Sequence, residues 1–455
     1  MSSKKPRVAA LPNDEGRTLG GGVGAAASLE KIASASALTE VELTYLKSPR
    51  AIRERAHAVL QLAQANQLAH FALRPERLPE LAKQVLRFTL ENYGELSRVP
   101  YHSRYRHFNA AGVDRVARLD AALVSLSPLE RLRAEADLVI VTVLLDAGAG
   151  ASFRYRESQT GLVLRRSEGL AIASFDWFMS GDLALDRRTP LRVESARLQS
   201  LEACDLERAF QVGAENPLLG VTGRTELLQR LGEVTTLGTT AKHDADANSN
   251  TAPRPGDFVV QLCASAKHGT LRAADVFERV LSVLSPIWPR HLARNGLAFD
   301  THATAAPALG DVFIHPQVGY VPFHKLSQWL TYSLCEAIER FGLRVEGLDE
   351  LTGLPEYRNG GLLLDAGVLE LREPAEANRE HTVSSPLIVE WRALTVALLD
   401  ELAGLVRHEA GATPESLPLV KLLEGGTWSL GRRLAEQRRP GAAPPLRVQS
   451  DGTVF

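Results

Sequence analysis

The stretch LSQWLTYSLCEAIERFG, residues 326–342, carries the clearest helical pattern in the chain. Its apolar and small residues recur at helical spacing and fall on one face: Leu326, Trp329, Leu330, Ser333, Leu334, Ala337, Ile338 and Phe341. Gly342 follows at the position where a left-handed residue commonly ends a helix. The segment therefore predicts a helix with one face in the core.

Further apolar segments follow this helix. Leu348–Thr352 leads into the turn residues Gly353-Leu354-Pro355, and Leu362–Leu369 resumes an apolar run. Trp391–Leu405 has the length of another buried helix. This order predicts a helix–turn–helix or helix-hairpin-helix in the C-terminal third.

The segments before residue 326 are also mainly helical in pattern. Ser48-Pro49 and Ser127-Pro128 mark helix starts, because serine caps a helix and proline needs no N–H at its first position. Leu78–Leu90 predicts one more helix, and Ala136–Leu145 is an apolar run that ends at Asp146.

A short β element interrupts the helices. Phe153–Arg156 and Gly161–Arg166 alternate in polarity and predict a small β-hairpin, and Gly169–Phe178 predicts a buried helix after it. The fold class that follows is mainly α, a multi-helix globule with one small β-hairpin.

The chain has few features that divide it into domains. We expect residues 1–40 to be a disordered N-terminal segment, since residues 1 to about 27 are rich in Gly, Ala and Pro. Residues 41–455 are predicted to form a single helical domain. The polar stretch near residues 236–255 is expected to be a surface loop or insertion.

Composition limits the classes of function. The 455 residues are 45% hydrophobic and 23% charged, with a net charge of −2. This balance argues against nucleic-acid or anionic-membrane binding, and no apolar run approaches the roughly 20 residues of a bilayer span. Three cysteines far apart in sequence suggest neither a disulfide framework nor a CxxC metal site. We expect a cytoplasmic protein that binds a small polar molecule.

Cofactor and metal motifs are weak. Gly20-Gly21-Gly22-Val23-Gly24-Ala25 fits a loose dinucleotide pattern, but the polar residues before it form no strand. His102 and His107 are too loosely spaced for a helical metal pair. We expect no metal and no organic cofactor, and these histidines to be hydrogen-bonded or at the surface.

Asp146 is the acid that most resembles a site residue. It closes the apolar run at Leu145 and precedes Gly148 and Gly150, which allow close approach of backbone or ligand. The alternative is an aspartate that only ends a helix and caps the next turn.

Acids and aromatic residues also meet around the predicted helix Gly169–Phe178. Glu168 and Asp176 flank it, and Trp177 stands beside Asp176, an arrangement suited to stacking on a planar group while an acid hydrogen-bonds it. The alternative is a core helix with acids at its rim.

Lys325 stands at the start of the helix that contains residues 326–342, where its charge opposes the helix dipole. An anionic ligand or a buried acid would favour a lysine at this position. The alternative is a side chain that extends to solvent.

The turn Glu356-Tyr357-Arg358 before Gly360-Gly361 holds more hydrogen-bonding groups than a linker needs. Glu390-Trp391-Arg392 is predicted to open the next helix, with Glu390 orienting Arg358 or Arg392. The alternative is an ion-pair scaffold.

Several motifs together resemble the uracil-catabolism family of the URC/Urg type, from about residue 40 to the C-terminus. They are Tyr101–Phe108 with Gly112–Arg115, Leu144–Gly150, Arg166–Leu170 and Leu354–Gly361. The resemblance implies a role in a pyrimidine degradation route that opens the ring and passes through ribosylurea to urea.

A more distant resemblance is to the queuosine-nucleotide N-glycosylases. Those enzymes have an Asp after an apolar helix, as at Asp146, an aromatic-basic segment similar to Val321–Gln328, and a Glu-x-Arg helix start like Glu390-Trp391-Arg392. Their Asp-Tyr-Arg turn corresponds to Glu356-Tyr357-Arg358, with Glu in place of Asp. The resemblance implies a helical, DNA-glycosylase-like fold with a helix-hairpin-helix.

Both resemblances imply cleavage of an N-glycosidic bond, with ribosylurea or its 5-phosphate as the expected substrate. Such a bond breaks through an oxocarbenium-like state, which needs a nearby carboxylate and an activated water. We expect Glu356 to activate water and Asp146 to hold ribose or urea, with either acid facing the sugar.

The remaining candidates would bind the substrate. Arg358, Lys325 and Arg392 are candidates for a phosphate, and Trp177 and Tyr357 for the walls. Two alternatives stay open: an amidohydrolase acting on a ureido intermediate, and a non-catalytic binding or scaffold protein.

Overall fold

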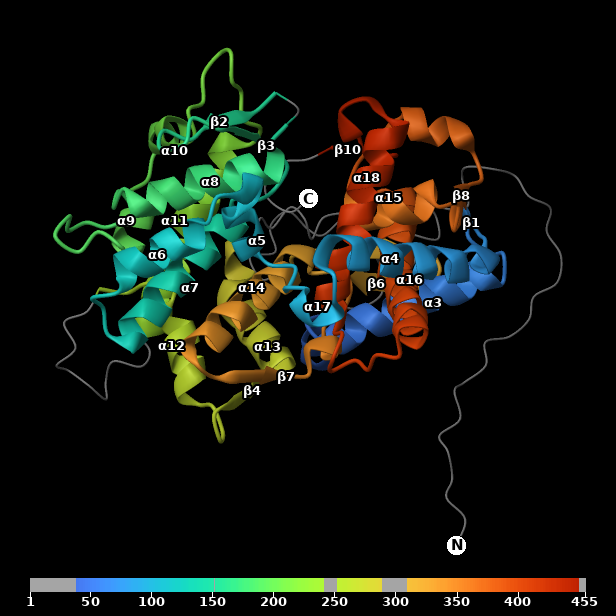
Figure 1. Cartoon of the computed structure of the whole chain (residues 1–455), viewed down its shortest axis with the longest axis horizontal. Helices are drawn as coiled ribbons and strands as arrows, with labels where there is room; N and C mark the ends of the chain where they lie inside the picture. Colours follow the sequence, from blue (N-terminus) through green and yellow to red (C-terminus); the bar gives the residue numbers. More distant parts are fainter. Residues whose placement is uncertain (1–37, 151, 241–251, 289–308, 450–455) are drawn as a thin grey trace, which may run out of the picture.

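The computed structural model describes residues 38–150, 152–240, 252–288 and 309–449, and most of them are helical (Figure 1). The longer helices are α3 (Pro49–Gln64), α4 (Leu78–Tyr93), α7 (Pro128–Leu144), α8 (Arg166–Met179), α11 (Val221–Thr240), α13 (Ala273–Leu284), α14 (Lys325–Phe341), α16 (Pro386–Ala410) and α18 (Trp428–Arg438). The shorter ones are α2 (Glu40–Leu46), α5 (Arg104–Phe108), α6 (Arg115–Leu123), α9 (Ser195–Gln199), α10 (Ala203–Ala209), α12 (Asp257–Ala264), α15 (Tyr357–Asp365) and α17 (Leu419–Leu422). The mainly helical class predicted from the sequence is confirmed.

The strands are short and pair two by two. The predicted hairpin is present as β2 (Arg154–Arg156) and β3 (Val163–Arg165), which are antiparallel with Tyr155 opposite Leu164. The other pairs are β1 (Phe71–Leu73) with β8 (Leu369–Leu371), β4 (Thr270–Arg272) with β7 (Arg344–Glu346), β5 (Val312–His315) with β6 (Gly319–Pro322), and β9 (Glu380–His381) with β10 (Arg447–Val448).

The helices fall into two halves, which lie left and right in Figure 1. In one half α7 packs on α8, α12 and α14, and α11 packs on α9 and α10. In the other half α16 packs on α3, α4 and α15, and α15 packs on α18. The buried apolar residues of both halves, including Leu138, Leu330 and Trp391, form one continuous cluster.

Local sequence explains the ends of several helices. Ser48, Ser127 and Ser385 each accept a backbone N–H and cap α3, α7 and α16, with proline at the first helical position. Gly342 ends α14 in the left-handed conformation, as predicted.

Three sequence-based boundaries need correction. The helix α16 begins at Pro386 rather than at Glu390, because Ser385 provides the cap. The helix α15 runs from Tyr357 to Asp365, so the apolar run 362–369 covers the end of α15, a turn over residues 366–368 and the first residue of strand β8. The helices α14 and α15 are joined by β7 and the short 3-10 helix Leu348–Glu350, a longer connection than a simple turn.

The polar stretch near residues 236–255 is described only at its two edges. The helix α11 extends through Thr240, and residues 241–251 lie outside the described part of the chain. At the far edge Arg254 is buried and pairs with Asp137 and Glu130. Residues 1–37 of the predicted disordered segment also lie outside the described residues, whereas Thr39 caps α2.

A buried ion pair ties the second half to α14. Arg392 of α16 donates to both carboxylate oxygens of Asp311 at 2.7 and 2.8 Å, and its guanidinium lies 4.1 Å from the centre of the Phe323 ring. The same Asp311 accepts the backbone N–H of Lys325 and so fixes the start of α14. Among the described residues, no helix has the length and apolarity needed to cross a membrane.

We expect Asp311→Asn to destabilise the protein by about 3 kcal/mol, because it removes the carboxylate charge that faces the buried Arg392 guanidinium. Urea unfolding followed by tryptophan fluorescence measures the change. Asp186→Asn is the matched control, because Asp186 pairs with Arg188 at an exposed surface site. Equal midpoints for the two variants would contradict this role of the buried pair.

Candidate functional site

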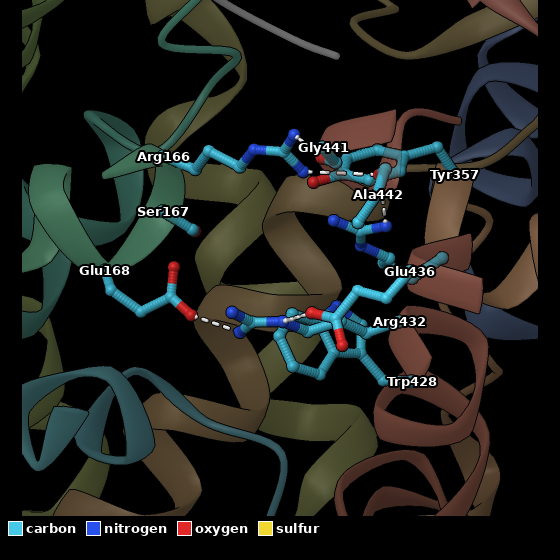
Figure 2. A pocket seen from close by; sticks show the side chains of 10 residues that line it. Arg166, Ser167, Glu168, Tyr357, Trp428, Arg432, Glu436, Gly441 and Ala442 are labelled. Carbon is cyan, nitrogen blue, oxygen red and sulfur yellow. Dashed lines mark hydrogen bonds and ion pairs between the residues drawn. The ribbon is translucent and has the colours of Figure 1, made fainter. Parts of the chain in front are cut away.

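One cavity of about 260 Å³ lies between the two halves (Figure 2). It is lined by Arg166, Ser167, Glu168, Tyr357, Arg358, Trp428, Arg432, Glu436, Gly441 and Ala442. The first three residues open α8, the next two open α15, and the others come from α18 and the turn after it. The volume lies below the roughly 300–1,000 Å³ of pockets for drug-sized ligands, so a small molecule fits this space best.

The hairpin β2–β3 sets the direction of the α8 wall. Gly169 of α8 lies directly against strand β3. A Cβ atom at this position would be only 3.0 Å from the backbone oxygen of Leu164. Arg166 begins the helix with a φ of 53°, a left-handed conformation that is uncommon for a residue with a side chain. The close packing and the left-handed start place residues 166–168 at the edge of the cavity.

The opposite wall depends on the close packing of α15 and α18. A side chain at Gly431 of α18 would collide with the backbone oxygen of Arg358 on α15. The absence of a side chain lets the two helices approach, and it brings Trp428 and Arg432 beside Tyr357 and Arg358.

Asp146 lies behind the α8 wall and holds Ser167. Both of its carboxylate oxygens accept the Ser167 hydroxyl, at 2.5 and 2.6 Å, and one of them also accepts Arg104 Nη1 at 2.7 Å. The Asp146 side chain is 8% exposed. It is therefore a paired, buried acid one residue away from the cavity, and not the cap of a following turn.

Arg104 joins this acid to a buried histidine. Its Nη1 also reaches His107 Nδ1 at 3.1 Å. Because arginine only donates, Nδ1 accepts and the ring proton sits on Nε2. Burial lowers the pKa of His107 to about 4, so the imidazole is neutral at neutral pH. The rings of Trp329 and Trp428 pack around it at 5.3 and 6.1 Å between centres.

The other end of the cavity carries a chain of opposite charges. Arg432 donates to Glu168 at 2.6 Å and to Glu436 at 3.2 Å. Burial works to raise the pKa of Glu168, but the charge and hydrogen bond of Arg432 act in the opposite direction, and the pKa is lowered. Glu168 is therefore an ionised carboxylate that lines the cavity.

Arg166 and Arg358 have a different kind of partner. Arg166 donates to the backbone oxygens of Gly441 and Ala442, and Arg358 Nη1 donates to the Ala442 oxygen at 2.9 Å. The Arg358 guanidinium also lies 4.8 Å from the centre of the Tyr357 ring. Both arginines therefore line the cavity, and the groups that accept their hydrogen bonds are uncharged carbonyls.

Glu356 lies beside the cavity and caps α15. Its two oxygens accept the backbone N–H groups of Arg358 and Asn359 at 2.7 and 2.6 Å. Burial raises the pKa of Glu356, against the effect of these two hydrogen bonds. The charge of Lys325 also works to lower the pKa of Glu356.

Asp176 and Trp177 lie elsewhere. The Asp176 carboxylate accepts Arg118 at 3.2 Å and the Tyr155 hydroxyl at 3.0 Å, and burial raises its pKa. Trp177 is buried edge-on against Phe210. Neither residue lines the cavity, because they sit at the far end of α8 from Glu168.

Glu390 and Arg392 form a scaffold, as the alternative interpretation held. Glu390 accepts the backbone N–H groups of Ala69 and His70, while Arg392 pairs with Asp311. The prediction that Glu390 orients Arg358 or Arg392 was wrong. A side chain near the start of a long helix projects to several neighbours, and the sequence does not tell which one.

Sequence reasoning missed several residues of the site. Ser167 and Arg104 stand inside motifs of the family resemblance but were not singled out, and His107 was considered only as a metal ligand. Trp428 and Arg432 carry no local motif, and only the packing of α18 on α15 brings them to the cavity. In the described part of the chain, no three His, Cys, Asp or Glu side chains gather in the manner of a metal site.

These features define a mainly helical protein with a small, charged cavity between two halves. The model of the family described as "Protein of unknown function (DUF1688)" matches residues 45–455. The chain is 36% identical to "Protein urg3" of Schizosaccharomyces pombe, over 90% of this chain and 98% of that protein. It is 33% identical to "Uracil catabolism protein 4" of Lachancea kluyveri, over 91% of this chain and 99% of that protein. The chain belongs to this URC/Urg family.

His107 predicts a specific dependence of stability on pH. Its pKa is about 4 in the folded state against 6.5 in the reference state, so between these values the unfolded chain binds more protons. Its contribution to stability is complete above pH 6.5, and up to about 3 kcal/mol is lost as the pH falls toward 4.

The thermal midpoints of wild type and His107→Gln at pH 7.5 and pH 4.5 measure this effect. We expect the wild type to lose more stability than His107→Gln on acidification. The exposed His268→Gln controls for the loss of an imidazole. The same loss in wild type and His107→Gln would contradict the assignment.

Proposed function

We propose that this protein takes part in uracil catabolism as an N-glycosidase that hydrolyses ribosylurea or its 5-phosphate. Water adds OH to the anomeric carbon of ribose, the C–N bond breaks, and the departing urea nitrogen takes up the proton. The name of the Lachancea kluyveri relative supports the pathway. The distant resemblance to the queuosine-nucleotide N-glycosylases supports the choice of an N-glycosidic bond.

The observation that carries the proposal is an ionised carboxylate, Glu168, in a small cavity with two aromatic walls. An oxocarbenium-like sugar is stabilised by a carboxylate near its anomeric carbon, and the same group can accept a proton from water. Tyr357 and Trp428 supply faces for the sugar and the planar ureido group. The cavity thus supplies a charge, walls and a size that match the reaction.

The roles expected from the sequence are redistributed among the acids. We assign the carboxylate at the sugar to Glu168, which lines the cavity. Asp146 keeps the role of holding the substrate, through the Ser167 hydroxyl that it orients. We treat Glu356 as a positioning residue, because both of its oxygens hold the backbone of α15 and thereby place Arg358.

The DNA-glycosylase-like fold with a helix-hairpin-helix stays part of the proposal. Its supporting features are α14 and α15, the second of which begins with the Glu356-Tyr357-Arg358 turn. In this arrangement the turn at the start of α15 places Tyr357 and Arg358 beside the ligand.

Purified protein incubated with ribosylurea or its 5-phosphate should release urea, measured by a coupled urea assay. Release from at least one of the two is expected. Ligand-induced thermal stabilisation without urea would favour a binding protein instead. No urea from either compound would overturn the proposed reaction.

We expect Glu168→Gln to lower kcat by about 100-fold or more, because it removes the charge and the proton acceptor. Glu356→Gln should mainly raise KM, because it loosens the start of α15 and displaces Arg358. Asp176→Asn is the control, since Asp176 lies outside the cavity. Steady-state kinetics with thermal midpoints separates these outcomes. A large loss of kcat in Glu356→Gln with Glu168→Gln active would return the catalytic role to Glu356.

A further inference from the structure

Three of the most deeply buried arginines in this protein are each neutralised by a carboxylate. Arg104 pairs with Asp146, Arg115 with Glu157, and Arg392 with Asp311. The cost of burying a charge explains this pattern, because an unpaired ion loses its hydration without compensation. A buried arginine that lacks such a partner therefore needs an explanation.

Arg358 is such an exception. It is 4% exposed, and its guanidinium donates to the Ala442 carbonyl. Its Nε is buried without a hydrogen-bond partner, and no acid of the described residues forms an ion pair with it. The nearby Glu356 is engaged with backbone N–H groups instead.

Arg166 brings a second positive charge to the same place. Its Nη1 reaches the Ala442 oxygen at 3.4 Å, so two guanidinium groups converge on one uncharged acceptor. Within the described ranges it forms no ion pair either. Two like charges held this close repel each other, and an anion between them would relieve the repulsion.

The backbone around the two arginines favours an anion as well. The helix α8 begins at Arg166 without a side-chain cap from Arg165, and the positive end of its dipole faces the cavity. Arg166, Gly441 and Ala442 all have positive φ values, of 53°, 63° and 52°. These uncommon conformations hold the two carbonyls against the guanidinium groups and keep both arginines in place.

The two ends of the cavity differ in charge. In Figure 2 Arg166 lies with Gly441 and Ala442 at one end, Glu168 and Arg432 lie at the other, and Ser167 stands between them. The acids at the second end would repel an anion, whereas the first end presents cations without acids. A ligand with a neutral polar part and one anionic group would therefore bind in a single orientation.

We propose that Arg166, Arg358 and the start of α8 form a subsite for a phosphate monoester, so that the ligand is a phosphorylated sugar derivative. Guanidinium groups bind phosphate oxygens through paired N–H donors, which fits two converging arginines. This proposal deepens the proposed function, since it selects the 5-phosphate over the unphosphorylated substrate. Its physical basis, the two arginines without acid partners, does not depend on the reaction.

Calorimetric titration of the full chain with ribose 5-phosphate, ribose and inorganic phosphate tests the subsite at constant ionic strength. Ribose 5-phosphate should bind at least about tenfold more tightly than ribose, and inorganic phosphate should compete with it. Arg358→Lys and Arg166→Gln should each weaken ribose 5-phosphate binding by about tenfold or more. Arg166 is only half-buried, so its replacement keeps the test valid if the Arg358 variant folds poorly.

Arg433→Gln is the matched control, because it removes the same charge from the outer side of α18, where Arg433 pairs with Glu91. It should bind ribose 5-phosphate like the wild type. Equal affinities for ribose and ribose 5-phosphate, or wild-type affinity in both arginine variants, would overturn the subsite. Phosphate binding without urea release from either substrate would support the subsite and refute the N-glycosidase activity. Urea release without a preference for the phosphorylated ligand would support the N-glycosidase activity and refute the subsite.

Discussion

The ion pair between Arg104 and Asp146 joins the elements that hold the start of α8 at the edge of the cavity. Arg104 lies on α5, its guanidinium donates to the carbonyl of Thr142 near the end of α7, and its backbone N–H donates to the Ser333 hydroxyl oxygen of α14. Asp146 in turn holds Ser167 at the start of α8. Because a buried charge must be paired, four helices are fixed relative to one another at this point. The position of the cavity wall follows from that constraint.

The same constraint separates scaffold from site. Arg392, Arg115 and Arg254 are bound to carboxylates and hold helices together. Arg166 and Arg358 are bound to carbonyls and keep their charge available to the cavity. In a helical protein of this size, a charged residue that the fold does not neutralise points to a functional site. A charged residue that the fold neutralises points to one much less strongly.

The elements of the fold were largely predictable, and the site only in part. Helical spacing, Ser-Pro starts and the hairpin pattern gave α3, α4, α7, α8, α14 and the β2–β3 pair, because these depend on neighbouring residues. Glu168, Tyr357 and Arg358 were predicted near the ligand and do line the cavity. Asp176 and Trp177 were predicted there and do not, because a local cluster of acid and aromatic residues looks the same in a packed core.

The sequence by itself determined the class of fold, most helix boundaries and a short set of acids and arginines that are able to bind or react with a ligand. Only the tertiary structure decided which of them meet. Arg104 and Asp146 are 42 residues apart, and Arg432 and Glu168 are 264 apart. Caps and periodicity act over a few residues, whereas these partners depend on how helices pack, which no local pattern encodes. The contrast between Arg392, which is neutralised, and Arg358, which is not, exists only after that packing.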